Sequence, residues 1–345
     1  MQTLKKAHDE LFRRSPDERF ETFDDLWRHC QQERDRSAVD WVQPSELSPS
    51  PQDGRLDLAF GQDDRCRMNS WSFGQLCSVA GVNRDTVNRL SPETAALVFD
   101  ETLPRGDKPL QVYRTTEMVR SVHGASYTRL DNVELLSMVR EYATDFVPPQ
   151  ESGRPGTQGG TGLYCGEQDM FCFLIDPAGW TEINGEAFAP GFFLWNSEVG
   201  KRSIGVQTFW FQAVCANHIV WDAVEVVDFS RKHTANVRDA LREIRLIIER
   251  LVEKRDVRRD GFAAVVAKAM RTRLGDDADE VLKLLGKHGV TRGIAKEAVE
   301  SAREQGALTV FAVVDALTRI SGRRTFAGDR TEVDQRASSL LALVS

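Results

Sequence analysis

The spacing of hydrophobic and polar residues changes along the chain and predicts two kinds of structure. Over residues 164–227, short apolar and aromatic runs separated by turn-forming residues predict several antiparallel strands. Residues 234–255 instead repeat their apolar positions at helical spacing, which predicts a long amphipathic helix. Shorter helices follow, with breaks near three glycines, Gly275, Gly289 and Gly306. We therefore predict an α+β fold with a central curled antiparallel sheet, flanking helices and a helical C-terminal part.

The first half of the chain predicts a mixture of helices and strands. In chain order we expect a charged helix over 1–43, a loop over 44–54, a strand over 56–61, two or three short helices over 72–103, paired strands over 111–130 and a helix over 131–146. Ser91 is typical of a helix N-cap, with Pro92 at the first helical position, and Asp131 is typical of another N-cap. We divide the chain into a charged helical N-terminal segment and loop (1–55), an α+β core domain (56–233) and a helical C-terminal region (234–345).

Composition indicates an ordinary globular protein of the cell interior. Of the 345 residues, 41% are hydrophobic and 28% are charged, and no apolar run is long enough to span a bilayer. The first twenty residues are charged throughout and lack an apolar signal segment, so we expect no export. The six cysteines follow no paired framework and are interpreted as free thiols. These features predict a cytoplasmic protein with no membrane association.

The charge is unevenly distributed along the chain. Its net value is -7, yet residues 229–345 hold 23 Lys and Arg against 17 Asp and Glu. A basic half on an acidic chain favours a polyanionic partner, while a solvated helical surface explains the same charges equally well.

One segment has the spacing of a helix-turn-helix. Phe73–Leu90 contains a small-residue turn followed by Thr-Val-x-Arg, and in that geometry Arg84, Asp85, Asn88 and Arg89 would face a major groove. An ordinary helix pair that buries its apolar residues explains the pattern too, and it is the commoner outcome.

Cysteine and histidine near the middle of the chain raise the question of an enzyme. Val214–Trp221 places Cys215, Asn217 and His218 within four residues, the residue types of a cysteine hydrolase. On a strand, however, Cys215 and Asn217 share one face and His218 points to the other, so the three cannot form a local triad. Cys165, Cys172, Cys215 and His218 are residue types that bind zinc, but the spacing Cys-x6-Cys is not typical of a zinc site. The alternation around Cys172 and Cys215 predicts instead that both are strand residues packed in a core. We predict no catalytic residue, no metal and no cofactor.

Four stretches of the sequence resemble a family of phage- or plasmid-like proteins built around domain of unknown function 932. They are QLCSVAGVNRDTVNRLSPETAALVFDETL, VRSVHGASYTRLDNVELL, GFFLWNSEVGKRSIGVQTFWFQAVCANHIVW and ALTVFAVVDALTRISG. The third is the most specific, with an Asn-Ser-Glu turn followed by a strand that ends Val-Cys-x-Asn. His218 stands where the family carries glycine, which argues against a catalytic histidine there. The resemblance implies a bacterial or phage protein associated with mobile DNA, and it brings no assigned reaction.

The order of strands, helix SYTRLDNVELLSMV, curled sheet and basic helix is also similar to the β-β-β-α core of single-strand annealing recombinases. Such a core would neutralise phosphates without reading sequence and leave bases free to pair. We expect the phosphates to be contacted by seven basic residues, Lys201, Arg202, Arg231, Lys232, Arg238, Arg242 and Arg245. Trp195, Trp210 and Trp221 are candidate stacking surfaces, although aromatic residues in a strand-rich block are usually core.

We therefore predict a non-enzymatic protein of a phage, plasmid or prophage that binds single-stranded DNA and assists annealing or recombination. Single-stranded nucleic acid is the expected partner, and a homo-oligomer is compatible with this function. A helix-turn-helix regulator of transcription or replication is the first alternative. An enzyme that uses Cys215 with a remote base such as His233 is the second.

Overall fold

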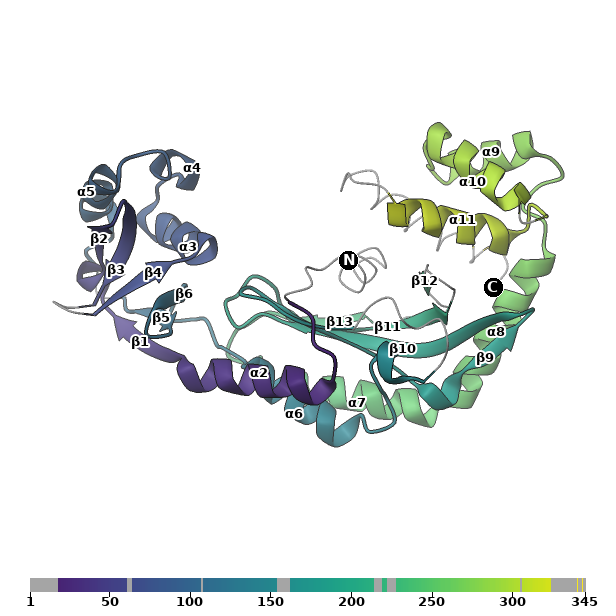
Figure 1. Ribbon diagram of the computed structural model, residues 1–345, viewed down its shortest axis with the longest axis horizontal. Coiled ribbons are helices and arrows are strands. Elements are labelled where there is room, and N and C mark those ends of the chain that lie inside the picture. Colours follow the sequence, from purple (N-terminus) through teal and green to yellow (C-terminus); the bar gives the residue numbers. More distant parts are fainter. Residues whose placement is uncertain are drawn as a thin grey trace.

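The chain forms an arch in a computed structural model (Figure 1). The described residues are 18–60, 64–106, 108–153, 162–213, 219–221, 228–304 and 306–323, together with Leu340 and Leu343. A small mixed lobe lies at one end of the arch, a large sheet with helices below it forms the middle, and a group of helices forms the other end. The fold is α+β with a helical C-terminal region, as predicted.

The small lobe is a six-stranded sheet with three helices on one face. Its strands, in spatial order, are β1 (Ala38–Val42), β5 (Leu110–Arg114), β6 (Met118–Gly124), β4 (Arg65–Met68), β3 (Arg55–Ala59) and β2 (Ser48–Gln52). Its helices are α3 (Ser70–Ala80), α4 (Arg84–Val87) and α5 (Pro92–Thr102). The predicted strand at 56–61, the strand pair at 111–130 and the short helices at 72–103 are confirmed.

Two predictions for the N-terminal segment are wrong in part. A helix was expected over 1–43, but α2 covers only Phe23–Arg36 and residues 38–42 form the edge strand β1; residues 1–17 lie outside the described part. The expected loop at 44–54 contains strand β2, whose sequence SPSPQ holds two prolines. Proline is tolerated there because β2 is the outer strand, so one of its sides needs no ladder hydrogen bonds.

The middle of the arch is a seven-stranded antiparallel sheet. The strands run β12 (Ile219–Trp221), β11 (Ile204–Ala213), β10 (Glu186–Asn196), β8 (Met170–Ile175) and β7 (Leu163–Cys165), while β13 (Asp228–Arg231) pairs with β11 and β9 (Thr181–Ile183) with β10. Along β10, Phe192 and Leu194 face a core shared with α2, α6 (Asn132–Tyr142) and α7 (Asp239–Glu253). Phe193 and Trp195 point to the opposite, aromatic face, as strand alternation requires.

The far end of the arch is built from the C-terminal helices. These are α8 (Arg255–Arg271), α9 (Ala278–Lys287), α10 (Arg292–Glu304) and α11 (Val310–Arg323). The expected breaks near Gly275, Gly289 and Gly306 are confirmed, because each glycine lies between two of these helices. Phe262 of α8 stacks on Trp210 of β11 with ring centroids 3.9 Å apart, which joins the helices to the sheet.

Candidate functional site

The Asn-Ser-Glu turn, the most specific sequence feature, forms a buried polar hub. Glu198 is 3% exposed, and its carboxylate accepts a hydrogen bond from the backbone N–H of Asn132 at 2.8 Å. The guanidinium of Arg120 donates to the same carboxylate at 3.1 Å. Burial raises the pKa of Glu198, and the neighbouring Arg120 opposes that rise. Glu198 therefore caps the N-terminus of helix α6 and anchors strand β6 at one point.

The residues after Glu198 attach the small lobe to the large sheet. The carbonyl of Val199 accepts hydrogen bonds from the Trp71 indole N–H at 2.7 Å and lies 3.0 Å from Nε2 of His123. Gly200 has a φ of +74°, and a Cβ at this position would lie 2.6 Å from the His123 ring. A side chain here would be strained by the positive φ and would have to displace the His123 ring.

Three rings stack beside the hub. His123 lies on Tyr127 with centroids 3.7 Å apart, and Tyr127 lies 5.4 Å from His233. Burial lowers the pKa of each histidine to about 4, and the cation of Arg129 adds to the effect. Both imidazoles are therefore neutral near pH 7. His233, considered above as a remote base for Cys215, is held in this stack.

Four of the seven predicted phosphate-binding residues surround the start of α7. A cleft of about 640 Å³ is lined by Arg231, Thr234, Asn236, Asp239, Arg242 and Glu243. Arg231 is held by an ion pair with Glu243 and donates to the Asn236 carbonyl at 3.1 Å. Arg238 is the N-cap residue of α7 beside this cleft. Lys232 is exposed and makes no ion pair with any described residue.

Arg238 and Arg242 are the most exposed of these arginines. Their side chains are 70% and 77% exposed, and each has one carboxylate partner at 3.6 Å, Glu134 and Asp239 respectively. Exposed ion pairs of this kind contribute at most about 1 kcal/mol, so they hold the arginines only weakly.

The other three predicted residues are held in different surroundings. Arg245 pairs with Glu249 at 2.7 Å and lies 3.8 Å above the Tyr142 ring. Lys201 lies 4.6 Å above the ring of Trp71, and Arg202 forms an ion pair with Asp169. Lys201 and Arg202 follow the Asn-Ser-Glu turn, and β11 begins just after them with Ile204, which faces Arg231 in the β11–β13 ladder. Neither Lys201 nor Arg202 lines the cleft at α7.

The tryptophans named as stacking candidates belong to the core where they are described. Trp195 is 0% and Trp210 is 1% exposed, so the core interpretation is confirmed for both. The side chain of Trp221 lies outside the described part. Among the described tryptophans, Trp41 is the large exposed one, at 55%, on edge strand β1. Sequence reasoning missed it because AVDWV was included in a predicted helix, although its β-branched and aromatic residues are typical of strands.

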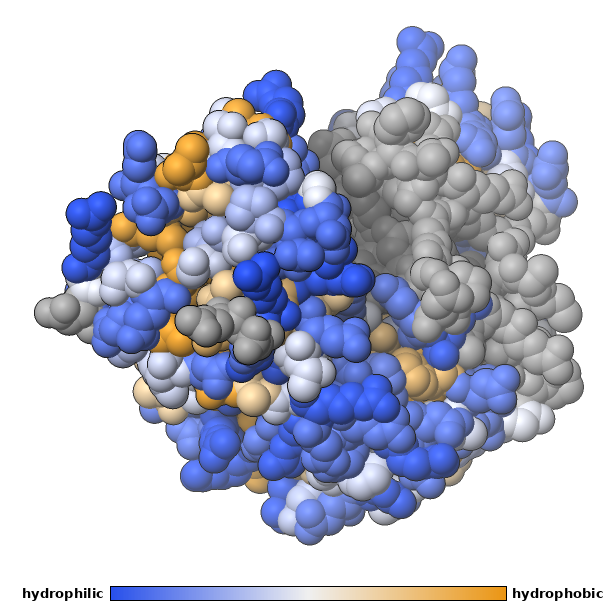
Figure 2. Space-filling view, turned by 60° about the vertical axis from the view of Figure 1, so that its left-hand side comes forward, coloured by the Kyte–Doolittle hydropathy of each residue, from blue (hydrophilic) through white to orange (hydrophobic). Residues whose placement is uncertain are grey.

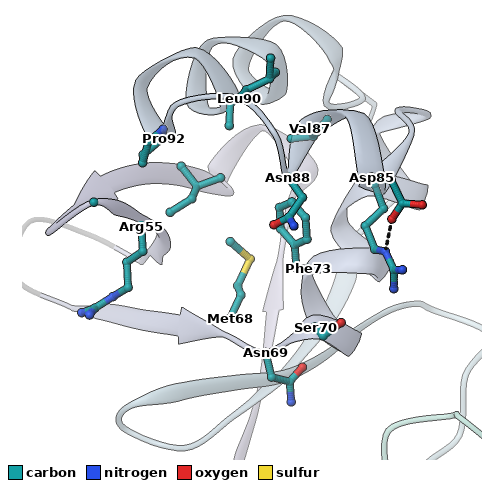
Figure 3. Close-up of a pocket in the computed structure, with 14 residues that line it drawn as sticks. Arg55, Met68, Asn69, Ser70, Phe73, Asp85, Val87, Asn88, Leu90 and Pro92 are labelled. Atoms are coloured by element: carbon teal, nitrogen blue, oxygen red, sulfur yellow. Dashed lines mark hydrogen bonds and ion pairs between the residues drawn. The ribbon is translucent and has the colours of Figure 1, made fainter.

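The helix-turn-helix segment folds into helices, but the second is short. After α3 and the turn at Gly81, α4 spans only Arg84–Val87; Asn88 is its C-cap and Arg89 follows it. A recognition helix must extend along the groove for several residues, and a single turn cannot do so. Val87 instead packs in the core of the lobe with Phe73 against it, whereas Leu90 is exposed; all three line a pocket of about 510 Å³ (Figure 3). Figure 2 shows apolar side chains reaching the surface of this lobe.

Two of the four residues considered above as zinc ligands, Cys165 and Cys172, are buried residues of strands β7 and β8. Cys172 is a buried strand residue, as predicted. Cys215, Asn217 and His218 lie outside the described residues. Within the described ranges, no group of three or more His, Cys, Asp or Glu is placed to hold a metal ion.

None of the described helices combines the length and the apolar character that crossing a bilayer requires.

Residues 120–284 match a known family, the domain of unknown function DUF932. The matched region contains Arg120, the Asn-Ser-Glu turn, the whole large sheet and the basic start of α7. The match supports the resemblance that the Asn-Ser-Glu turn indicates. The search of curated proteins found no match to this chain, and the search of solved structures found none either.

Proposed function

We propose that this protein binds single-stranded nucleic acid at the start of α7, without reading its sequence. The observation that carries the proposal is the exposure of Arg238 and Arg242 beside a cleft that also presents Thr234 and Asn236. Arginine, threonine and asparagine side chains are typical phosphate ligands, and such contacts position a strand without specifying its bases.

The carboxylates in the cleft set the expected strength of binding. Asp239 and Glu243 pair with Arg242 and Arg231, so a phosphate must compete with them. An exposed ion pair contributes little to stability, and a phosphate oxygen can take the place of a carboxylate oxygen on the guanidinium. We therefore expect weak binding that depends strongly on salt. Lys232, with no described acidic partner, adds a cation beside the cleft.

The finer form of the proposal is that the protein assists annealing or recombination of DNA in a phage, plasmid or prophage. Contacts confined to phosphates leave the bases free to pair with a complement, and no catalytic residue is required. The resemblance described from the sequence implies this context, and residues 120–284 match the model of the same family, which carries no assigned activity. The regulator alternative is less favoured, because α4 is a single helical turn.

The test is a salt titration of binding to single-stranded DNA, duplex DNA and RNA. Arg238→Gln/Arg242→Gln should weaken single-strand binding equally for different sequences and flatten the plot of log K against log salt by about 1.4, roughly 0.7 for each lost phosphate contact. The matched control is Arg28→Gln/Arg34→Gln. These arginines of α2 are at least half exposed and each also pairs with one carboxylate, so the control removes the same charge elsewhere.

Arg245→Gln is a second comparison, within α7 itself. Because Arg245 is held by Glu249 and Tyr142, we expect this variant to keep most of the slope. Equal slopes for the α7 and α2 double variants, with unchanged circular dichroism, would reject the proposed surface. A preference for one duplex sequence would favour the regulator alternative.

A further inference from the structure

Two cysteines that are 135 positions apart in sequence meet at the junction of α2 and the large sheet. The thiol of Cys30 on α2 donates to the sulfur of Cys165 on β7, with the Sγ atoms 3.9 Å apart. Cys30 is 1% exposed and Cys165 is 8% exposed. Neither the charge pattern nor the nucleic-acid surface gives these residues a role.

A cavity of about 440 Å³ reaches both thiols. His29 and Glu33 of α2, Arg120 of β6 and the hub residue Glu198 also line it. The amide nitrogen of Asn132 lies 3.8 Å from the Cys165 sulfur, so two hydrogen-bond donors converge on that atom. The thiol pair is therefore connected to a polar space rather than enclosed in an apolar core.

The surroundings favour the thiolate at Cys165. The hydrogen bond from Cys30, and after it the one with His29, lower the pKa of Cys165 below the ordinary value of a thiol, against the opposing effect of burial. The same hydrogen bond raises the pKa of Cys30, which therefore keeps its proton. Cys165 is therefore the thiol that more readily becomes a nucleophilic thiolate, and Cys30 lies beside it as a protonated thiol.

We propose that Cys165 and Cys30 form a peroxide-reactive thiol pair, with Cys165 as the attacking residue and Cys30 as the resolving one. The Cys165 thiolate attacks one oxygen of hydrogen peroxide, the O–O bond breaks, and the departing hydroxide takes a proton to become water. The product is a sulfenic acid at Cys165. The Cys30 sulfur then attacks that sulfur, the S–O bond breaks, and the hydroxide leaves with the Cys30 proton as a second water. Two thiols are oxidised to one disulfide while one peroxide is reduced to two waters.

The charge of the cavity favours a small neutral oxidant. Besides Glu198, four further acidic side chains line it, namely Glu18, Glu33, Glu117 and Glu167, against two arginines, Arg67 and Arg120, so acidic groups are in excess. An anionic disulfide such as oxidised glutathione would be repelled by these carboxylates, whereas hydrogen peroxide is uncharged. The sulfur atoms must approach from 3.9 Å to about 2.05 Å for the disulfide to form, and the bond would then tie α2 covalently to β7.

The experiment treats the full-length protein with stoichiometric hydrogen peroxide and measures intact mass and peptide maps. We expect the loss of two hydrogens and a peptide pair that joins Cys30 to Cys165. Cys165→Ala should remove this cross-link and slow peroxide consumption at least about tenfold. Cys30→Ala should leave a sulfenic acid on Cys165 that dimedone traps. Cys77→Ala, a buried cysteine of the small lobe, is the matched control and should behave as wild type.

Two results would overturn the proposal. One is the absence of the Cys30–Cys165 cross-link in folded wild-type protein while other thiols oxidise. The other is an unchanged rate of peroxide consumption in Cys165→Ala. If that variant fails to fold, alkylation of wild-type protein decides the matter: labelling of Cys165 should rise with pH at a midpoint clearly below that of an ordinary thiol. A midpoint near that of an ordinary thiol, about 8.5, would contradict the proposal.

Discussion

The carboxylate of Glu198 caps a helix whose first residue, Asn132, lies 66 positions earlier in the chain. Sequence rules place Asp131 at the N-cap of α6, and it does occupy that position, but its side chain makes no capping hydrogen bond. Asp131 instead pairs with Arg34 of α2 at 3.4 Å. Helix α6 is thus started by a residue of the large sheet, which couples the helix to the Asn-Ser-Glu turn.

The buried ion pair at this hub gives the first prediction. Glu198→Gln keeps an acceptor for the Asn132 N–H but leaves the buried Arg120 cation without its close carboxylate. We expect the free energy of unfolding to fall by about 3 kcal/mol, as when one partner of a buried pair is removed. Urea unfolding followed by circular dichroism measures the change.

Glu33 is the matched control because it pairs with the same arginine. Its carboxylate lies 3.8 Å from Arg120 and is 30% exposed, so Glu33→Gln should cost less than about 1 kcal/mol. Equal losses in the two variants would show that Glu198 has no special part in the hub.

Local chemistry explains which elements could be predicted. Ser91, Pro92 and Glu93 mark the start of α5, and in the structure the Ser91 hydroxyl accepts a hydrogen bond from the N–H of Thr94 at 3.2 Å. Such signals involve only residues a few positions apart. The alternation along β10 and the glycines between C-terminal helices are equally local.

Distant partners explain what could not be predicted. Strand β1 exists because Val39 and Trp41 pair with Tyr113 and Gln111 of β5, which are 74 and 70 positions away in the sequence. The candidate functional residues also differ in whether the sequence alone could indicate them. The excess of basic residues after residue 229 indicates Arg238 and Arg242 as phosphate contacts, whereas the contact between Cys30 and Cys165 depends on α2 packing against β7, which no spacing rule indicates.

Gly200 gives the second prediction, with a second glycine as its control. Gly185 also has a positive φ, +88°, but a Cβ there would meet nothing within 4 Å. Gly185→Ala should therefore cost only the backbone strain, about 1 kcal/mol. Gly200→Ala adds a clash with His123 and should cost about 2–4 kcal/mol in total. Denaturant midpoints measure both, and similar losses would mean that the His123 ring moves aside freely.

The third prediction concerns acid. The pKa of His123 and of His233 is about 4 in the folded protein, whereas the ordinary value is 6.5. Between these two pH values, the two histidines are protonated in the unfolded chain and neutral in the folded protein. The stability that this difference contributes is fully present above pH 6.5 and is lost as pH falls toward 4. The pKa difference corresponds to at most about 3 kcal/mol for each histidine. His233→Phe keeps a ring beside Tyr127 without a titrating group, and it should reduce the loss of stability between these pH values.

His29 supplies a control of opposite sign. Its pKa is raised, first by the hydrogen bond with Cys165, so its contribution to stability is present below pH 6.5 and is lost as pH rises through the folded pKa. His29→Gln should therefore remove stability mainly on the acid side and make the acid-induced loss steeper, whereas His233→Phe makes it shallower. Urea midpoints at pH 4.5, 5.5, 6.5 and 7.5 would separate the two. Parallel pH profiles for wild type and His233→Phe would show that the stacked histidine is not the group that acid protonates.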